Sequence, residues 1–242
     1  MELIWQNLLN WLQSVGMHLG QRLPSDLAPA VTQVADKLDL PSLLALAGAL
    51  GWASGFRLYA VVFLVGMAGA LGWMPLPAGL AVLQHPALLA ASGIMLFVEF
   101  FADKIPGLDS VWDIVHSVIR IPAGAALAAG ALGADSATMA MAAALLGGTL
   151  AATSQAAKTT TRAAINTSPE PFSNVFASLV EDGLVVGAVW LASMHPLVFC
   201  VVLALTVVLM WLVTAALFRF LRALFTRLAV VFGRQTHRMS PP

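Results

Sequence analysis

Charged residues are scarce in this chain. Only 10% of its 242 residues are Asp, Glu, Lys or Arg, whereas 60% are hydrophobic and the mean hydropathy is +0.87. This composition is typical of an integral membrane protein rather than a soluble one. Twelve basic and twelve acidic residues give a formal net charge of zero, so the composition does not indicate a nucleic-acid partner.

Cysteine and the common catalytic motifs are almost absent as well. The single cysteine, Cys200, cannot form an intrachain disulfide, and its apolar neighbours favour a small buried side chain. The sequence has no phosphate-binding loop, zinc-spaced His or Cys cluster, dinucleotide-binding glycine pattern or nucleophile elbow. We therefore expect that the protein binds no cofactor and is not an enzyme, although an acidic cluster described below would also suit a lipid-modifying enzyme. No cleavable signal peptide is expected, because the first residues carry Glu2 and several amides in place of a basic start.

The charges that remain are concentrated between two apolar runs, in the sequence EFFADKIPGLDSVWDIVHSVIR at residues 99–120. Glu99 and Asp103 share one helical face, and Pro106 is expected to break the chain after them. The next helix carries four ionisable side chains on one stripe: Asp109, Asp113, His116 and Arg120. An ionised side chain at the centre of a bilayer costs about 2.5–3.5 kcal/mol, so this stripe must face polar groups or a wet cavity.

Long apolar segments predict an all-α fold, a polytopic transmembrane bundle of about six helices. The expected spans cover residues 43–72, 86–104, 110–132, 137–157, 173–194 and 197–217, with the last at the periphery of the bundle. The first span is longer than the ~20 residues that a bilayer needs and contains Arg57, so we expect it to be tilted or broken. Runs of Ala and Gly in the third and fourth spans predict close approach of helices.

Three regions follow from this pattern. They are N-terminal amphipathic or interfacial helices with a linker at residues 1–40, the bundle at 41–218, and a basic cytoplasmic tail at 219–242. With both termini in the cytoplasm, the outward-facing turns contain no Lys or Arg, which satisfies the positive-inside rule. We therefore expect a multi-pass protein of the bacterial inner membrane with cytoplasmic N- and C-termini. Two halves of three spans would be inverted relative to one another, so a 3+3 inverted repeat is one arrangement that the pattern allows.

The ionisable residues within the spans predict a polar site between spans one to five, in a cation- or proton-coupled transporter. Carboxylates suit protons and hard cations, and a histidine can relay protons. The candidate ion- or substrate-binding residues are Glu99, Asp103, Asp109, Asp113, His116, Glu181 and Asp182. The candidate counter-charges or anion-binding residues are Arg57, Lys104, Arg120, Lys158, Arg162, Asn166 and Asn174.

Two other functions remain open. The basic side chains would suit an anionic lipid head group or an organic anion, in a protein that binds or flips it. Alternatively, ion pairs such as Arg120 with Asp113 or Glu181 only fix the register of helices in a non-transporting scaffold. His116 has no second His or Cys nearby, so a transition-metal site of nitrogen and sulfur is not expected. The expected partners are the lipid bilayer and a small ion or anionic small molecule, and a homo-oligomer is compatible with each function.

Three segments carry a resemblance to a known family: ASGFRLY at residues 53–59, VEFFADKIPGLDSVWDIVHSVIRIPAGA at 98–125, and AAKTTTRAAINTSPEPFSN with SLVEDG at 156–183. Over residues 43–192, the chain resembles an uncharacterised bacterial family of small integral membrane proteins, described only as a domain of unknown function. The resemblance implies a polytopic membrane protein and no established activity. Glu99 followed by Asp103 and Lys104 is also similar to a motif of cation/proton exchangers that export calcium or manganese, although the exchangers have fewer residues between the two acids.

Overall fold

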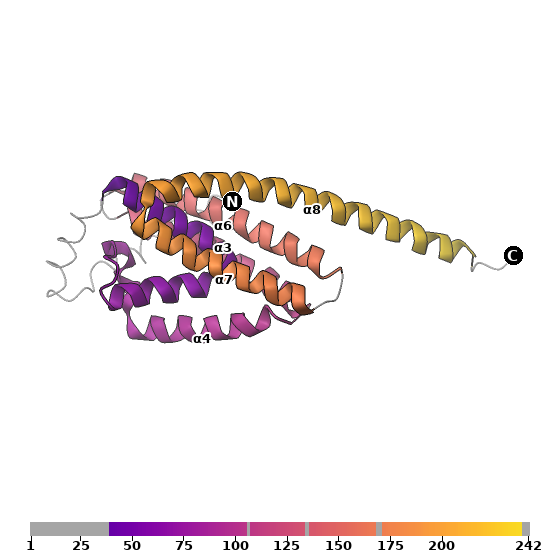
Figure 1. The fold of residues 1–242 in the computed structure, drawn as a ribbon, viewed down its shortest axis with the longest axis horizontal. Helices are drawn as coiled ribbons and strands as arrows, with labels where there is room; N and C mark the ends of the chain where they lie inside the picture. Colours follow the sequence, from indigo (N-terminus) through magenta and orange to yellow (C-terminus); the bar gives the residue numbers. More distant parts are fainter. Residues whose placement is uncertain (1–38, 106, 134–135, 168–170, 239–242) are drawn as a thin grey trace, which may run out of the picture.

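The described helices form one elongated bundle (Figure 1). The computed structural model describes residues 39–105, 107–133, 136–167 and 171–238, and this part of the chain contains no β-strand. Its helices are α3 (Leu40–Ala70), the 3₁₀-helix η1 (Ala78–Gln84), α4 (Pro86–Ala102), α5 (Leu108–Leu132), α6 (Ala137–Ile165), α7 (Pro171–Met194) and α8 (Pro196–Arg238). The all-α prediction is confirmed. The interfacial helices and linker predicted for residues 1–40 lie almost wholly outside the described residues.

Five of these helices are long and apolar enough to cross a membrane: α3, α5, α6, α7 and α8. The 17 residues of α4 measure about 26 Å, somewhat less than the ~30 Å hydrocarbon core of a bilayer. η1 precedes α4 at a bend of 69°, and the two together are apolar and long enough to form a broken span. Counting that pair as one span gives the six that the sequence predicts.

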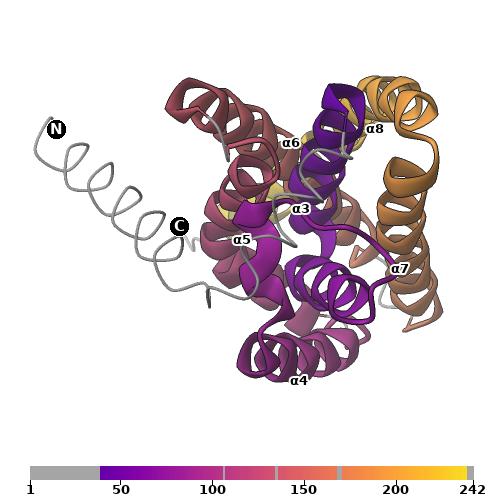
Figure 2. The ribbon, with the colours of Figure 1, turned by 90° about the vertical axis from the view of Figure 1, so that its left-hand side faces the viewer.

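α3 is the central helix of the bundle. In the view along the bundle in Figure 2, it lies among α5, α6, α7 and α8, and it packs against each of them as well as against α4. Its first turn is capped by Asp39, whose carboxylate accepts a hydrogen bond from the Ser42 backbone N–H at 3.2 Å. The backbone leaves helical geometry at Arg57, with φ −145° and ψ 78°. The first span was expected to be tilted or broken, and the structure shows that it is broken.

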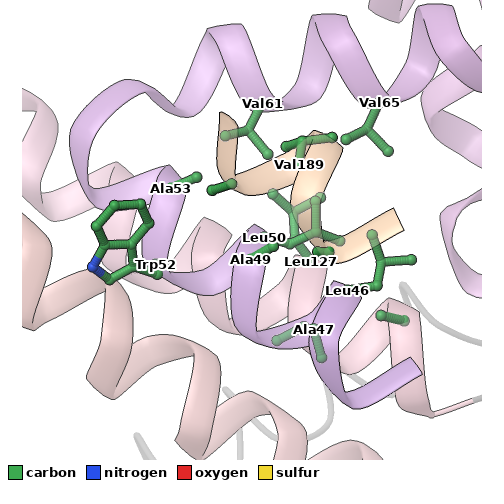
Figure 3. Close-up of a cluster of buried hydrophobic side chains, with 14 of the residues drawn as sticks. Leu46, Ala47, Ala49, Leu50, Trp52, Ala53, Val61, Val65, Leu127 and Val189 are labelled. Atoms are coloured by element: carbon green, nitrogen blue, oxygen red, sulfur yellow. The ribbon is translucent and has the colours of Figure 1, made fainter. Parts of the chain in front are cut away.

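Apolar packing surrounds α3 on both sides of this break. Figure 3 shows Leu50, before the break, close to Leu127 of α5 and Val189 of α7, and it shows Val61 and Val65 after the break. Because lipid tails are as apolar as leucine, van der Waals packing between helices, rather than exclusion from water, stabilises such a core. These contacts hold both halves of α3 in place, and so they determine where Arg57 lies.

Small residues allow the backbones of α3, α5 and α6 to approach one another, as the Ala- and Gly-rich spans predict. A Cβ atom added at Gly51 of α3 would lie 2.5 Å from the Cα atom of Gly147 in α6. One added at Gly124 of α5 would lie 2.7 Å from the Cβ atom of Ala151 in α6. Neither distance is sterically allowed, so side chains larger than hydrogen at these positions would separate the helices.

Three features of the second half differ from the prediction. α7 begins at Pro171 rather than at residue 173, because proline is well suited to the first turn of a helix. α8 does not end near residue 217 but continues to Arg238, a length of about 64 Å that exceeds the ~30 Å bilayer core. Cys200 is exposed and not buried, because α8 lies at the periphery and has few buried side chains. That peripheral position is itself as predicted.

The contact between Gly51 and Gly147 predicts that Gly51→Ala destabilises the protein by about 1–3 kcal/mol, the usual cost of overpacking. Its thermal midpoint in detergent, followed by intrinsic tryptophan fluorescence, should fall. Gly187→Ala is the matched control, since a Cβ atom at Gly187 of α7 meets nothing within 4 Å. Equal midpoints for the two variants would show that α3 and α6 are not packed as described.

Candidate functional site

Charged side chains from four helices and from the end of α4 meet inside the bundle. We call them the ion-pair network, which consists of Arg57, Glu99, Asp103, Asp113, Arg120, Lys158, Arg162, Glu181 and Asp182. Only Asp182, with 29% of its side chain exposed, has substantial access to the surface of the bundle, and the others are at most 8% exposed. All of them are residues that the sequence marks as candidates.

Asp103, immediately after α4, is shared by three cations. Its Oδ2 atom lies 2.9 Å from Lys158 Nζ, 3.3 Å from Arg57 Nη1 and 3.9 Å from Arg162 Nη2. The Arg162 guanidinium also donates to the Asp103 backbone carbonyl at 3.1 Å. This one residue therefore connects the end of α4 to α3 and α6, although α4 itself packs mainly on α3.

Lys158 of α6 is shared in the same way by three acids. Besides Asp103, its Nζ atom lies 3.1 Å from Asp113 Oδ1 and 3.4 Å from Glu181 Oε2. It also donates to the backbone carbonyl of Phe56 at 3.1 Å. Phe56 immediately precedes the break in α3, so the ammonium stabilises one of the backbone oxygens next to the interrupted helix.

Arg120 joins α5 to α4 and α6. Its Nη1 atom donates to Asp113 Oδ1 at 2.8 Å and to Gln155 Oε1 at 2.9 Å, and its Nη2 atom pairs with Glu99. Gln155 also donates to the Asp113 backbone carbonyl at 3.1 Å. Gln155 was not among the predicted site residues, although an amide within a span, one turn before Lys158, is a recognisable signal.

The adjacent acids of α7 bind different cations. Glu181 accepts two hydrogen bonds from Arg162 Nη2, both at 3.0 Å, and a third from Arg162 Nε at 3.2 Å. Asp182 Oδ1 lies 2.8 Å from Arg57 Nε. Arg57 Nη2 donates to the Ser178 hydroxyl at 2.6 Å. Ser178 was also missed, although it lies one helical turn before Asp182 on the same face.

A chain of amides continues from the network toward the start of α5. Arg162 Nη1 donates to Asn174 Oδ1 at 3.2 Å, and Asn174 Nδ2 donates to Asn166 Oδ1 at 2.9 Å. Asn166 Nδ2 in turn donates to both carboxylate oxygens of Asp109 at 3.1 Å. Asp109 is fully buried and also accepts the Gly107 backbone N–H at 2.8 Å. These contacts join the ends of α5, α6 and α7.

His116 and Lys104 lie outside the network. The Nδ1 atom of His116 is 2.9 Å from the carbonyl of Trp112, and its ring stacks on that indole at 3.9 Å. Lys104 donates to the Phe100 carbonyl at 3.0 Å and lies over its ring, and it makes no ion pair in the described part of the chain. Both were expected to take part in the polar site. In the structure, Lys104 reaches the edge of the network, where its Nζ atom donates to the Ser178 hydroxyl at 3.5 Å, and His116 contacts Trp112.

Several polar atoms of the network have no hydrogen-bond partner among the described residues. Three are buried carboxylate oxygens, Glu99 Oε2, Asp103 Oδ1 and Asp113 Oδ2, and the others are guanidinium nitrogens of Arg57 and Arg120. Each belongs to a side chain with no exposed surface. An unpaired buried acceptor is costly, and these oxygens are the positions in the network where a proton or a cation would be stabilised.

Hollows on the molecular surface lie away from these oxygens. One is lined by Phe97, Val98, Phe101, Ala102, Ile105, Leu108 and Trp112, and another by Thr161, Ile165, Phe172, Ser173, Phe176, Ala177 and Val180. The charged side chains therefore point at each other, as expected, but in direct contact rather than around one of these hollows. In the described residues, no group of three or more His, Cys, Asp or Glu has the arrangement of a metal site.

Apolar helices of spanning length around buried ion pairs define a polytopic α-helical membrane protein. A family model described as "Domain of unknown function (DUF4126)" matches residues 44–216, and the chain belongs to this family. The matched region contains every member of the ion-pair network. No curated protein and no solved structure matches the chain. The resemblance to an uncharacterised family is confirmed, whereas the likeness to cation/proton exchangers stays a prediction.

The contacts of Arg120 predict that Arg120→Gln destabilises the protein by about 3–5 kcal/mol, because it leaves the buried Glu99 carboxylate without a cation and removes one of the two cations beside Asp113. Adding Glu99→Gln should recover part of this loss, since it removes the unpaired charge. Thermal unfolding in detergent measures both effects. Arg219→Gln, at an exposed arginine of α8, is the control and should leave the midpoint within error.

Proposed function

We propose that the protein is a cation- or proton-coupled transporter, and that the ion-pair network is its coupling site. The observation that carries the proposal is an excess of buried carboxylate with unpaired oxygens. Five acids and four cations make up the network. Uptake of one proton or one monovalent cation neutralises the remaining negative charge. Where water is excluded, a neutral network is strongly favoured over a charged one.

Shared partners allow the network to rearrange without isolating a charge. Asp103 contacts three cations, and Lys158 contacts three acids. When a proton or an ion neutralises one carboxylate, the cation that it held still has another acid within reach. Because these residues belong to different helices, a change of partners moves those helices relative to one another. Coupling between an ion and a conformation requires two such alternative arrangements of the helices, one of which the ion favours.

The break in α3 supports the same function. Interrupted helices near the middle of the membrane are a recurring feature of secondary transporters, where their free backbone groups face the substrate or ion. Here the break at Arg57 places a side-chain cation and the Phe56 carbonyl at the network. Non-helical backbone is tolerated at such a depth because protein groups, rather than lipid, surround it.

A site for an anionic head group has less support from the geometry. Arg57, Arg120, Lys158 and Arg162 each have a carboxylate within 3.3 Å, so an anion would have to displace an acid of the protein itself.

We place the protein in the bacterial inner membrane with both termini in the cytoplasm, as the distribution of basic residues predicts.

Transport can be tested in proteoliposomes with an imposed pH gradient. We expect wild-type protein to carry a pH-dependent cation flux, and Asp113→Asn or Glu181→Gln to abolish it by removing a shared acid. Asp39→Asn makes the same chemical change at an exposed helix cap and should retain full flux. Gel filtration confirms that each variant is folded.

Other outcomes would identify the alternatives. Unchanged flux in both acid variants contradicts the coupling role. Binding of anionic phospholipid head groups that Arg120→Gln abolishes would favour the anion site. A folded variant without the buried acids that still complements a deletion strain would favour a scaffold.

A further inference from the structure

The break at Arg57 divides α3 into two arms that run in opposite directions. We call residues 40–56 the first arm and residues 58–70 the second arm. Figure 3 shows the two arms side by side, with Leu46 on the first and Val65 on the second, and both side chains belong to the same apolar core. This arrangement is that of a helical hairpin, which turns at Arg57.

The first arm is parallel to α6. A Cβ atom added at Gly51 would meet the backbone of Gly147 in α6. Phe56, further along the first arm, accepts a hydrogen bond at 3.1 Å from Lys158, which lies further along α6. Residue numbers therefore rise together on the two helices, and the first arm ends at the ion-pair network.

The second arm runs against the direction of α4. A Cβ atom added at Gly93 of α4 would lie 3.1 Å from the ring of Phe63. One added at Gly66 would lie 2.9 Å from Leu89, which comes earlier in α4. Residue numbers thus rise on the second arm while they fall on α4. The second arm therefore leads from the end of α4 back toward its start.

α4 and α6 themselves point in the same direction. At one end, Asp103 after α4 contacts Lys158 in the second half of α6. At the other end, Gly79 of η1, before α4, approaches Gly130 of α5, and α6 begins a few residues later at Ala137. Because the first arm follows α6 and the second arm opposes α4, both ends of α3 lie at the end of the bundle where α4 and α6 begin.

We infer that α3 is a re-entrant hairpin, which enters and leaves the membrane at the same face instead of crossing it. At a rise of 1.5 Å per residue, the first arm measures about 25 Å and the second about 20 Å. Each arm is shorter than the ~30 Å hydrocarbon core of a bilayer. The apolar composition and combined length of the two arms are those of a span, but the turn at Arg57 folds that length in two.

Protein groups enclose the hairpin, as a re-entrant segment requires. Within its most apolar window, 56% of the residues are buried, compared with 33% or less in α5, α6, α7 and α8. At the turn, Lys158 donates to the Phe56 carbonyl. The Arg57 guanidinium pairs with Asp103 and Asp182. Non-helical backbone is tolerated at membrane depth where protein, rather than lipid, surrounds it, so the ion-pair network stabilises the turn.

The hairpin changes the number of crossings. With η1 and α4 counted as one span, the helices that cross the membrane are α4, α5, α6, α7 and α8. An odd number of crossings places the start of α3, at Leu40, and the far end of α8 on opposite sides. The placement of both termini in the cytoplasm follows only if α3 is counted as a sixth crossing, so the hairpin replaces it.

The basic residues give the orientation. Lys104, between α4 and α5, and the five arginines of α8 after residue 217 lie toward one face. The turns at the other face contain no Lys or Arg, and they are residues 71–77, 133–136 and 195. The segment before Leu40 carries only two basic residues, Arg22 and Lys37. The positive-inside rule therefore puts the end of α8 in the cytoplasm and Leu40 in the periplasm.

Cysteine labelling tests the path of the chain directly. In a Cys200→Ser background, Leu40→Cys and Trp73→Cys each place one thiol at an exposed position on either side of α3. Phe225→Cys places one on α8, about 44 Å from its start. We expect a membrane-impermeant maleimide to label the Leu40 and Trp73 variants equally in spheroplasts and in lysed cells, and the Phe225 variant only after lysis. Cys200→Ser alone is the control and should stay unlabelled.

The sides on which Leu40 and Trp73 are labelled decide the outcome. Labelling of these two variants from opposite faces shows that α3 crosses the membrane and overturns the inference, and so does labelling of Leu40→Cys and Phe225→Cys from the same face. Labelling of Phe225→Cys alone in spheroplasts supports the hairpin and overturns the orientation. If either α3 variant does not fold, Asp39→Cys and Pro75→Cys, at neighbouring exposed positions, take the same test.

The labelling is independent of the proposed function, because it reports the path of the chain whether or not a variant carries a cation flux. Labelling of Leu40 and Trp73 variants from one face, in a protein without flux, would support the hairpin and contradict transport. Coupled flux in a protein that is labelled from opposite faces at these positions would support transport and contradict the hairpin.

Discussion

A charged side chain keeps its charge inside a membrane protein only if opposite charges and hydrogen bonds replace the water that it has lost. In this protein, four cations and five carboxylates enclosed by α3, α4, α5, α6 and α7 supply these opposite charges to one another. Each cation meets an acid from another helix, so the positions of these five helices depend on one another. A shift of one helix would separate charges in a region of low dielectric constant, where separation is expensive.

The close packing of the helices makes these ion pairs geometrically accessible. Gly51 and Gly147 bring the backbones of α3 and α6 together, and the Lys158 ammonium can then reach the Phe56 carbonyl across that interface. Ser154, one turn before Lys158, reaches the Trp52 carbonyl at 2.7 Å in the same way. The side chains of α6 thus bond to backbone oxygens of α3 in the turns that follow the close contact. The small residues therefore bring the helices close enough for the buried polar and charged side chains to reach their partners.

The sequence alone identified the polar stripe of α5, because its members recur at helical spacing. In the structure, all four members are buried. The sequence did not identify their partners. Arg120 was expected to pair with Asp113 or Glu181, and the structure pairs it with Asp113 and Glu99, while Glu181 binds Arg162. Periodicity determines which residues share a face of one helix, but not which other helix that face meets. His116 shows the same limit, since it lies on the stripe but contacts Trp112 and Tyr59.

Composition and periodicity by themselves determined that this chain forms apolar helices of membrane-spanning length with ionisable groups turned away from lipid, because the cost of exposing a charge to hydrocarbon applies to each helix separately. They also indicated that the first span is tilted or broken, since it is longer than a bilayer needs and carries a charge in its middle. The structure shows that the span is broken at Arg57. Only the tertiary structure decided that Asp103 and Lys158 are the shared members of the network and that Gln155 and Ser178 complete it. Pairing depends on the distances and rotations between helices, and these result from packing contacts between residues far apart in the sequence.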